Sequence, residues 1–380
     1  KWGRNSWAPA VAYKKIDGKD KFFLYFANSG NGIAVLTSDS PTGPFVDPIQ
    51  GPLISRETPH CAEVTWLFDP AVLMDDDGNA YIYFGGGIPD DEHIANPQTA
   101  RVAKLGADMI SLDGEPIAID NVSYLFEDSG INKINGEYYY SYCSNFQVPN
   151  EKVDELGFGC GEIILMKSNN PMGPFSMVGS VLKNPEHFFG LGGNNHHCIF
   201  TFEGKHYIAY HTRILEQEMG VLKGYRSTNI DEVVIKDGVI VPTEASRKGV
   251  SQTKSLNPYK TQSAATMANM AGVNTVAITD GQMVVTDMED GSWIQVAGVD
   301  FGNEGANEFM VTVLHAAQSG KILLYLDSLE NGECIGQVEI AAGSAEETVK
   351  VTLEKKPAGV HDLYFGFEGT GYQVKDWNFC

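Results

Sequence analysis

Short apolar runs separated by polar turns dominate the chain, and the spacing typical of helices is almost absent. The clearest case lies within residues 124–143, where runs at 130–134 and 138–143 flank Asn135-Gly136. Asn-Gly between two such runs is typical of a β-hairpin, because both turn positions tolerate a positive φ. The pattern predicts a hairpin here and an all-β chain.

A similar module recurs along the first part of the chain: a strand, a polar turn, an aromatic-rich strand and one or two further strands. Copies occupy residues 7–37, 68–105, 124–166 and 196–228, and the last module ends near residue 242. The phrase Ser-Pro-Thr-Gly-Pro-Phe at 40–45 returns as Asn-Pro-Met-Gly-Pro-Phe at 170–175. Repetition of such a unit is typical of the blades of a β-propeller, of which the sequence shows four.

The pattern changes after a connection at residues 243–260. Short alternating runs follow at residues 292–296, 308–313, 321–326, 349–353 and 361–367, with turn residues between them. Strands at this spacing favour a separate β-sandwich. We therefore expect a propeller domain at residues 1–258 and a β-sandwich jelly roll at residues 259–380.

Composition narrows the range of partners. The hydrophobic fraction of 43% and the charged fraction of 20% are those of an ordinary globular protein. A net charge of −22 without a basic run disfavours a nucleic-acid partner, whereas a neutral sugar polymer is indifferent to charge. No apolar run reaches the roughly 18 residues that span a bilayer, so no membrane partner is expected. The six cysteines lack C-x-x-C spacing, which makes a zinc site improbable and leaves one pair, Cys143 with Cys160, open.

Polar or aromatic residues begin the first strand of each module. In a propeller these strand starts line the central channel, so residues far apart in sequence converge there. They are Trp7, Asp69, Glu127 and the pair His196 and His197.

Two of these residues are carboxylic acids. Glu127 follows Tyr124, Leu125 and Phe126, and an apolar setting raises the pKa of a carboxyl group, as a general acid requires. Glycoside hydrolysis needs such an acid together with a second carboxylate. Taken alone, Glu127 fits a solvated loop beside Asp128 better than a general acid, and Asp69, held extended by Pro70, fits a turn cap better than a catalytic group.

Several separate motifs resemble glycoside hydrolase family 43, in the order of that family and over roughly residues 1–258. The resemblance implies a five-bladed propeller and an inverting glycosidase, closest to the arabinoxylan arabinofuranohydrolases and the related β-xylosidases. The motifs are Trp7-Ala-Pro, Phe68-Asp-Pro, Asp75-Asp-Asp-Gly-Asn-Ala-Tyr81, Phe126-Glu-Asp-Ser and Gly193-Asn-Asn-His-His197.

The resemblance also implies roles for individual residues. Glu127 would be the general acid, and Asp69 a further carboxylate that tunes the pKa of that acid and orients it. His196 matches a histidine that faces a calcium ion in the central channel, which makes calcium the expected cofactor. Without the resemblance, a His-His pair at a strand start is more often buried and hydrogen-bonded.

The remaining expected site residues contact the sugar. Trp7 and Phe68 would form walls of the pocket, because apolar sugar faces stack on aromatic rings, and His197 would lie beside the substrate. Arg226 matches an arginine that reaches into the pocket from the last blade, although it also fits a surface strand.

The sequence departs from the family in one important respect. The family's general base is an Asp in the first blade, ahead of the Trp-Ala-Pro segment, whereas no Asp here precedes Asp17, which lies in a turn. We therefore expect the first blade and the base to be missing, as in a shortened chain, a fragment completed by another polypeptide, or a decayed enzyme. The competing function is a non-catalytic carbohydrate-binding protein.

The C-terminal part resembles carbohydrate-binding modules of family 6, through Gly291-Ser-Trp-Ile294, Val299-Asp-Phe-Gly302, Gly359-Val-His-Asp-Leu363 and Asp376-Trp377. Trp293 and Trp377 fit the core or a binding platform equally well. Ser263 and Ala265 replace a Glu pair that often holds calcium, and Lys375 replaces an Asn that touches sugar, so a structural module stays open.

The combined expectation is an inverting hydrolase that removes α-L-arabinofuranosyl or β-D-xylosyl units. Its partner would be a plant cell-wall polysaccharide, arabinoxylan or xylo-oligosaccharides. Such a protein would be secreted or periplasmic, with a leader lost ahead of Lys1.

Overall fold

The computed structural model describes residues 2–236, 238–279, 282–314, 316–343 and 345–380. The chain divides into two compact units, residues 1–250 and 251–380. The division lies eight residues before the predicted boundary at 258/259 because the linking segment bonds to the second unit. Leu256 donates its N–H to the carbonyl of Gly298, and Pro258 accepts the N–H of Phe379, both at 2.8 Å.

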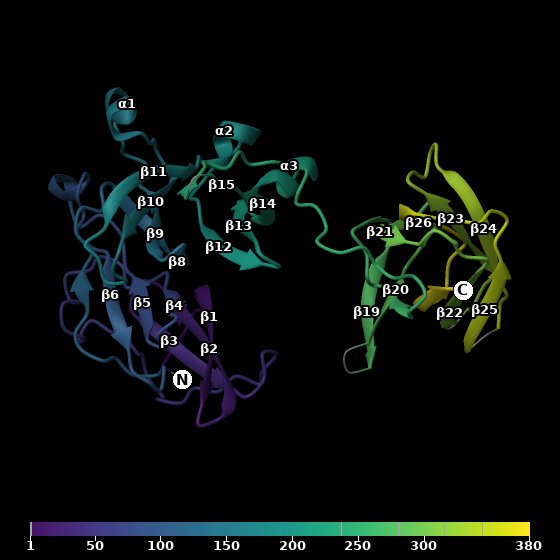
Figure 1. Cartoon of the computed structure of the whole chain (residues 1–380), viewed down its shortest axis with the longest axis horizontal. Coiled ribbons are helices and arrows are strands. Elements are labelled where there is room, and N and C mark those ends of the chain that lie inside the picture. Colours follow the sequence, from purple (N-terminus) through teal and green to yellow (C-terminus); the bar gives the residue numbers. More distant parts are fainter. Residues whose placement is uncertain (1, 237, 280–281, 315, 344) are drawn as a thin grey trace. The chain divides into compact units, whose positions relative to one another are not determined.

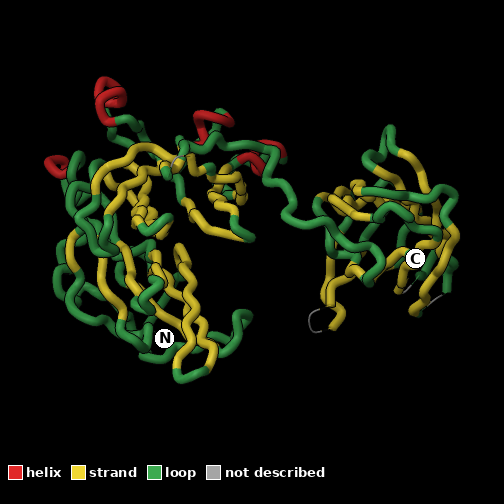
Figure 2. The backbone as a smooth tube through the Cα atoms, in the orientation of Figure 1, coloured by secondary structure: helices red, strands yellow, loops and turns green. Residues whose placement is uncertain are grey.

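The first unit is built from antiparallel sheets that follow one another along the chain (Figures 1 and 2). Each of the four predicted modules forms one larger sheet, with orders β1-β2-β3, β4-β5-β6-β7, β8-β9-β10-β11 and β12-β13-β14, and β15 pairs with β16. The strands are β1 (Trp7–Ile16), β2 (Lys19–Ala27), β3 (Ile33–Ser38), β4 (Ala71–Met74), β5 (Ala80–Phe84), β6 (Arg101–Leu105), β7 (Ile117–Ala118), β8 (Leu125–Ile134), β9 (Glu137–Ser144), β10 (Ile163–Ser168), β11 (Ser176–Leu182), β12 (His197–Phe202), β13 (Lys205–Thr212), β14 (Ser227–Val233), β15 (Ile235–Lys236) and β16 (Val239–Ile240).

Short helices lie in the connections between these strands. They are η1 (Asp91–His93), η2 (Asn150–Lys152), α1 (Val153–Leu156), α2 (Pro185–Phe189) and α3 (Ile214–Glu218). The all-β prediction is confirmed. Within the described residues, no helix is long and apolar enough to cross a membrane.

The hairpin predicted at Asn135-Gly136 is confirmed. Ile134 pairs with Glu137 across the turn, and the two turn residues have φ of +53° and +82°. Strand β8 begins earlier than predicted, at Leu125, and its pairing with β9 is irregular on both sides of Glu127. A β-bulge of this kind re-aims a side chain, and here it does so at the candidate acid.

Neighbouring sheets share cores, because alternate side chains of a strand point to opposite faces. In β9, Tyr138, Tyr140 and Tyr142 join a core shared with the β4–β7 sheet, whereas Tyr139 and Cys143 join one shared with the β12–β14 sheet. A further core joins the first two sheets. The first strands also contact one another in order, β1 with β4, β4 with β8 and β8 with β12. Strand starts from all four sheets are therefore brought together.

The second unit is a β-sandwich, as predicted, with one core between two sheets. Trp377 is 1% exposed and packs against Phe309 and Phe365, so it belongs to the core. One sheet has the order β19-β20-β27-β22-β25 with β17 paired to β27, and the other has the order β18-β21-β26-β23-β24. The strands are β17 (Gln262–Ser263), β18 (Asn269–Ala271), β19 (Asn274–Thr279), β20 (Gln282–Thr286), β21 (Trp293–Asp300), β22 (Glu308–Leu314), β23 (Gly320–Leu326), β24 (Glu333–Ile340), β25 (Glu346–Thr352), β26 (Val360–Glu368) and β27 (Gln373–Phe379).

The cysteines form no disulfide. All six are free thiols in this structure. The disulfide between Cys143 and Cys160 that the sequence left open is therefore not formed. Cys143 is fully buried and donates its thiol to the carbonyl of Ser144.

Candidate active site

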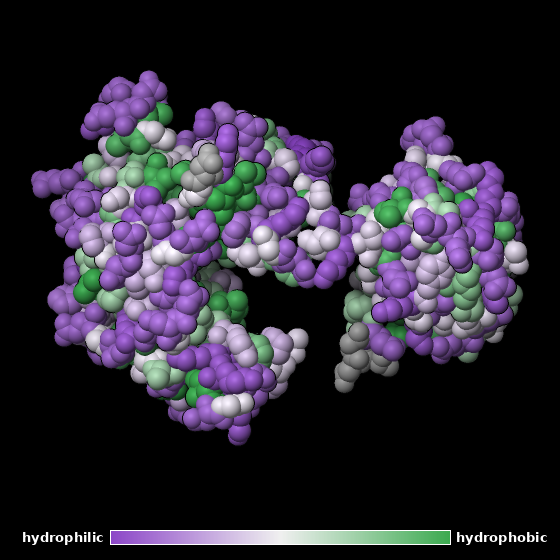
Figure 3. Space-filling view, in the orientation of Figure 1, coloured by the Kyte–Doolittle hydropathy of each residue, from purple (hydrophilic) through white to green (hydrophobic). Residues whose placement is uncertain are grey.

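The strand starts of the first unit surround a cavity of about 1150 Å³. Figure 3 shows the first unit deeply indented, with both hydrophobic and hydrophilic residues around the indentation. Every site residue expected from the sequence contributes to the lining. These residues are Trp7, Phe68, Asp69, Glu127, His196, His197 and Arg226.

Glu127 lies in the interior of this cavity. It is 7% exposed, and its Oε1 has no hydrogen-bond partner among the described residues. Burial, followed by the negative charge of Asp69, raises the pKa of Glu127 to about 7. The alternative of a solvated loop is therefore excluded, and Glu127 can hold a proton near neutral pH.

Asp69 is buried beside Glu127 at the entry to β4. Its φ is +50°, in the left-handed region, and not the extended shape expected from Pro70. Aspartate tolerates this region better than most residues, and here the carboxylate Oδ2 accepts the backbone N–H of Asp128 at 3.0 Å. Burial raises the pKa of Asp69, and the nearby imidazole of His196 opposes that rise.

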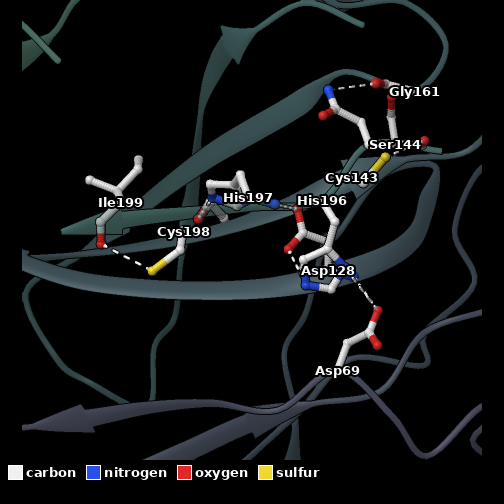
Figure 4. A network of polar contacts seen from close by, with 11 residues as sticks. Asp69, Asp128, Cys143, Ser144, Gly161, His196, His197, Cys198 and Ile199 are labelled. Carbon is white, nitrogen blue, oxygen red and sulfur yellow. Dashed lines mark hydrogen bonds and ion pairs between the residues drawn. The ribbon is translucent and has the colours of Figure 1, made fainter. Parts of the chain in front are cut away.

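Asp128 is the centre of a buried polar network (Figure 4). Its Oδ2 accepts the backbone N–H of His197 at 3.0 Å and also the ring Nδ1 of His197, while its Oδ1 lies 3.2 Å from Nε2 of His196. Burial alone would raise the pKa of Asp128, but the two imidazoles hold it below the ordinary value. The carboxylate of Asp128 therefore orients the rings of both histidines. Its backbone N–H orients the carboxylate of Asp69.

His197 is held on both sides. Its side chain is fully buried, and its Nε2 lies 2.8 Å from Oγ of Ser141. Both ring nitrogens are therefore occupied, and the contact of His197 with substrate stays a prediction. Gly130 makes room for this pair, since a Cβ there would lie 2.4 Å from Oγ of Ser141 and 3.0 Å from Nε2 of His197.

His196 lies between two carboxylates. Its Nδ1 is 3.8 Å from Oδ2 of Asp69, and its Nε2 faces Asp128. Burial opposes protonation, yet the charges of Asp128 and Asp69 raise the pKa of His196. The described residues contain no group of three or more His, Cys, Asp or Glu that could hold a metal ion. The calcium ion expected to face His196 through few protein ligands and many waters stays a prediction.

The walls of the cavity are aromatic. Trp7 is 50% exposed at the start of β1, whereas Phe68 is 5% exposed and packs edge-on against Trp66 with ring centroids 5.3 Å apart. Trp66 also packs against Phe126 at 5.4 Å and is itself 38% exposed. Apolar sugar faces stack on such rings, so Trp66 presents more aromatic surface to a ligand than Phe68.

Arg226 reaches the cavity from the segment before β14. Its guanidinium donates to Oδ1 of Asn194 at 3.0 Å, and both residues line the cavity. A neighbouring residue, His211, also lines it, and burial followed by the charge of Arg226 lowers the pKa of His211 to about 4. His211 is therefore neutral near pH 7, with an Nε2 that has no partner among the described residues.

Four further residues of the site were not predicted from the sequence: Trp66, Asp128, Asn194 and His211. Trp66 stands two residues before Phe68, a spacing that places side chains on the same side of an extended segment, so this signal was available. Asp128 has no such signal, because sequence alone does not reveal that both histidines of the pair at 196–197 turn toward it.

Comparisons with known proteins identify the family of the chain. Residues 1–240 match the model of Glycosyl hydrolases family 43, and residues 263–380 match that of Carbohydrate binding module (family 6). An arabinoxylan arabinofuranohydrolase from Paenibacillus polymyxa is 48% identical over 384 residues, which cover 98% of this chain. The chain spans 59% of the length of that relative.

A second relative comes from Bacillus subtilis (strain 168). This arabinoxylan arabinofuranohydrolase is 46% identical over 387 residues, which cover 98% of this chain and 74% of the relative. A crystal structure of a family 43 arabinoxylan arabinofuranohydrolase from B. subtilis, in complex with cellotetraose, superposes with a TM-score of 0.88 at 44% identity. It covers 100% of this chain and 80% of that one. The match over residues 1–240 and these relatives show that the chain belongs to glycosyl hydrolases family 43.

Proposed function

We propose that this protein is an inverting glycoside hydrolase that removes α-L-arabinofuranosyl, or alternatively β-D-xylosyl, units from arabinoxylan. The observation that carries the proposal is Glu127, a buried carboxyl group with a pKa raised to about 7 on the wall of a large cavity. A carboxylic acid that stays protonated near neutral pH is what a glycosidase uses to protonate its leaving group.

The proposed reaction is a single displacement at the anomeric carbon. Glu127 gives its proton to the glycosidic oxygen as the bond to the anomeric carbon breaks, and water attacks that carbon from the opposite face. Inversion requires a base to take the proton of this water, and none of the described residues is assigned that role. Asp69 contributes by raising the pKa of Glu127, and Asp128 contributes by fixing Asp69 and the two histidines.

The names of the relatives support arabinoxylan as the substrate, since both act on that polymer. Rates on an aryl α-L-arabinofuranoside, an aryl β-D-xyloside and wheat arabinoxylan test this assignment. We expect arabinose release from the polymer and from the arabinofuranoside. Release of xylose alone would assign the site to a β-xylosidase.

A second candidate function is non-catalytic carbohydrate binding. Inverting hydrolysis needs a base as well as an acid, and the carboxylates that line the cavity among the described residues are Asp69 and Glu127. We therefore assign no residue to the base. Retained binding of arabinoxylan without sugar release would favour this second function.

Replacing Asp69 by asparagine tests its effect on Glu127. The charge of Asp69 raises the pKa of Glu127, so its removal should lower that pKa. A general acid works only while protonated, and activity should fall as pH rises through this pKa. We expect the alkaline limb of kcat/KM to begin below pH 7 in Asp69→Asn. An unmoved limb would show that Asp69 does not tune Glu127.

The second unit is proposed to bind polysaccharide through Trp293 on β21. This side chain is half-buried and lies 5.9 Å from the ring of Tyr364 on β26, on the sheet face away from the core. Trp293→Ala should weaken binding to insoluble arabinoxylan by about tenfold, the order that one stacked aromatic contributes. Hydrolysis of a small aryl glycoside is the control and should not change. Unaltered polymer binding would favour a structural module.

Three further expectations stay proposals. The first is a propeller of the five-bladed type. It is supported by the succession of antiparallel sheets in the first unit, whose first strands contact one another. The second is calcium facing His196 through few protein ligands and many waters. A secreted or periplasmic location is consistent with a polymeric substrate too large to enter a cell.

A further inference from the structure

A buried carboxylate outside the cavity holds a loop of the cavity wall. Glu216 on α3 is 3% exposed, and its Oε2 accepts the backbone N–H groups of Lys223, Gly224 and Tyr225 at 2.8, 2.8 and 2.9 Å. Burial alone would raise the pKa of Glu216, but the N–H groups of Lys223 and Tyr225, together with Arg213, keep it below the ordinary value. An ionised carboxylate with three backbone donors is a strong anchor.

The anchored loop has little else to hold it. The side chains of residues 222–226 are all exposed, so packing in the core does not fix their positions. Glu216 also holds the turn that precedes this loop, because its backbone carbonyl accepts the N–H of Val221 at 2.9 Å. Glu216 therefore determines the path of the main chain that leads to Arg226.

The same carboxylate is tied to the other side of the cavity wall. Its Oε1 accepts Nε of Arg213, and the guanidinium of Arg213 also donates to the carbonyl of Gly192 at 3.3 Å. Gly192 lies two residues before Asn194, which accepts the guanidinium of Arg226 at 3.0 Å. One partly buried ion pair thus connects the two loops that present Arg226 and Asn194.

We propose that Glu216 is a positioning residue that sets Arg226, together with Asn194, for contact with the sugar. This inference rests on the proposed function of the cavity. Glu216 does not touch the substrate, and its effect passes through the loop 221–226 and through Arg213.

Glu216→Gln tests the proposal against a matched control on the same helix. The variant keeps the size of the side chain but places an amide where an anion accepts three N–H donors. We expect KM for an aryl α-L-arabinofuranoside to rise by about tenfold, with a smaller change in kcat, because a displaced positioning group weakens binding. The control, Glu218→Gln, alters an exposed glutamate that pairs with Arg247 and should leave KM unchanged.

A double-mutant cycle separates positioning from a general effect on the fold. In an Arg226→Ala background, Glu216→Gln should raise KM by less than about twofold, because both changes remove the same contact. Full additivity of the two effects would overturn the proposal. If Glu216→Gln does not fold, Arg213→Gln replaces it in the cycle, since it cuts the link to Gly192 and leaves the loop amides bonded.

Hydrogen exchange provides a readout that does not depend on turnover. Amides of residues 221–226 should exchange faster in Glu216→Gln than in the parent or in Glu218→Gln, with the remaining strands unaffected. Unchanged exchange there would contradict the inference even if the cavity binds no arabinofuranoside. If Arg226→Ala alone weakens binding, the function stands and only the role of Glu216 fails.

Discussion

Replacing Glu127 by glutamine is expected to lower arabinose release from arabinoxylan by about 10²- to 10⁴-fold, the usual contribution of a general acid. Glutamine has the same shape but carries no transferable proton. The alkoxide that leaves from the polymer is a poor leaving group, so its departure depends on that proton. Reducing-sugar release measured at pH 6 compares the variant with the parent.

The identity of the leaving group supplies the control for this variant. Dinitrophenolate leaves without protonation, so dinitrophenyl α-L-arabinofuranoside should react in Glu127→Gln at a rate near that of the parent. A loss of equal size on both substrates would show that Glu127 binds or supports the site and does not donate a proton.

The same variant should also change stability with pH. The pKa of Glu127 is raised from an ordinary value of 4.5 to about 7, so its ionisation destabilises the folded state as pH rises through that window. Glutamine cannot ionise. Above pH 7, Glu127→Gln should therefore exceed the parent in free energy of unfolding by on the order of 3 kcal/mol, whereas below pH 4 the two should be similar.

Replacing Asp128 by alanine is expected to lower the free energy of unfolding of the first unit by about 3–5 kcal/mol. Asp128 is fully buried, and its removal leaves the ring of His197 and the N–H of His197 without their acceptor. Urea unfolding followed by far-UV circular dichroism measures the loss, and the transition of the second unit serves as an internal reference.

An exposed aspartate provides the matched control for this change. Asp120→Ala removes the same atoms at the surface and should change the unfolding free energy by no more than about 0.5 kcal/mol. Equal effects of the two substitutions would contradict the central position of Asp128 in the network.

Strand pattern and turn chemistry allowed much of the fold to be predicted. The Asn135-Gly136 hairpin, the four repeated sheets and the C-terminal sandwich all follow from local signals, because turns and alternation act within a few residues. The start of β8 was placed too late, since a β-bulge at Glu127 interrupts the alternation that marks a strand.

The site was partly predictable for a different reason. Asp69 and Glu127 stand at strand starts, and the stacking of sheets brings strand starts together, so sequence position was informative. The direction in which each side chain points could not be predicted from its sequence position. The ring nitrogens of His197 contact Asp128 and Ser141, and the roles of Glu216 and Asn194 arise from loops that meet only in the folded chain.

The measurement that tests the central claim most directly is proton NMR of the anomeric signals while the protein acts on an arabinoxylan oligosaccharide. We predict that the first arabinose released has the inverted, β configuration, and that release is lost in Glu127→Gln. Release that persists at the parent rate in Glu127→Gln, or a first product of retained configuration, would contradict the assignment of Glu127 as the general acid of an inverting hydrolase.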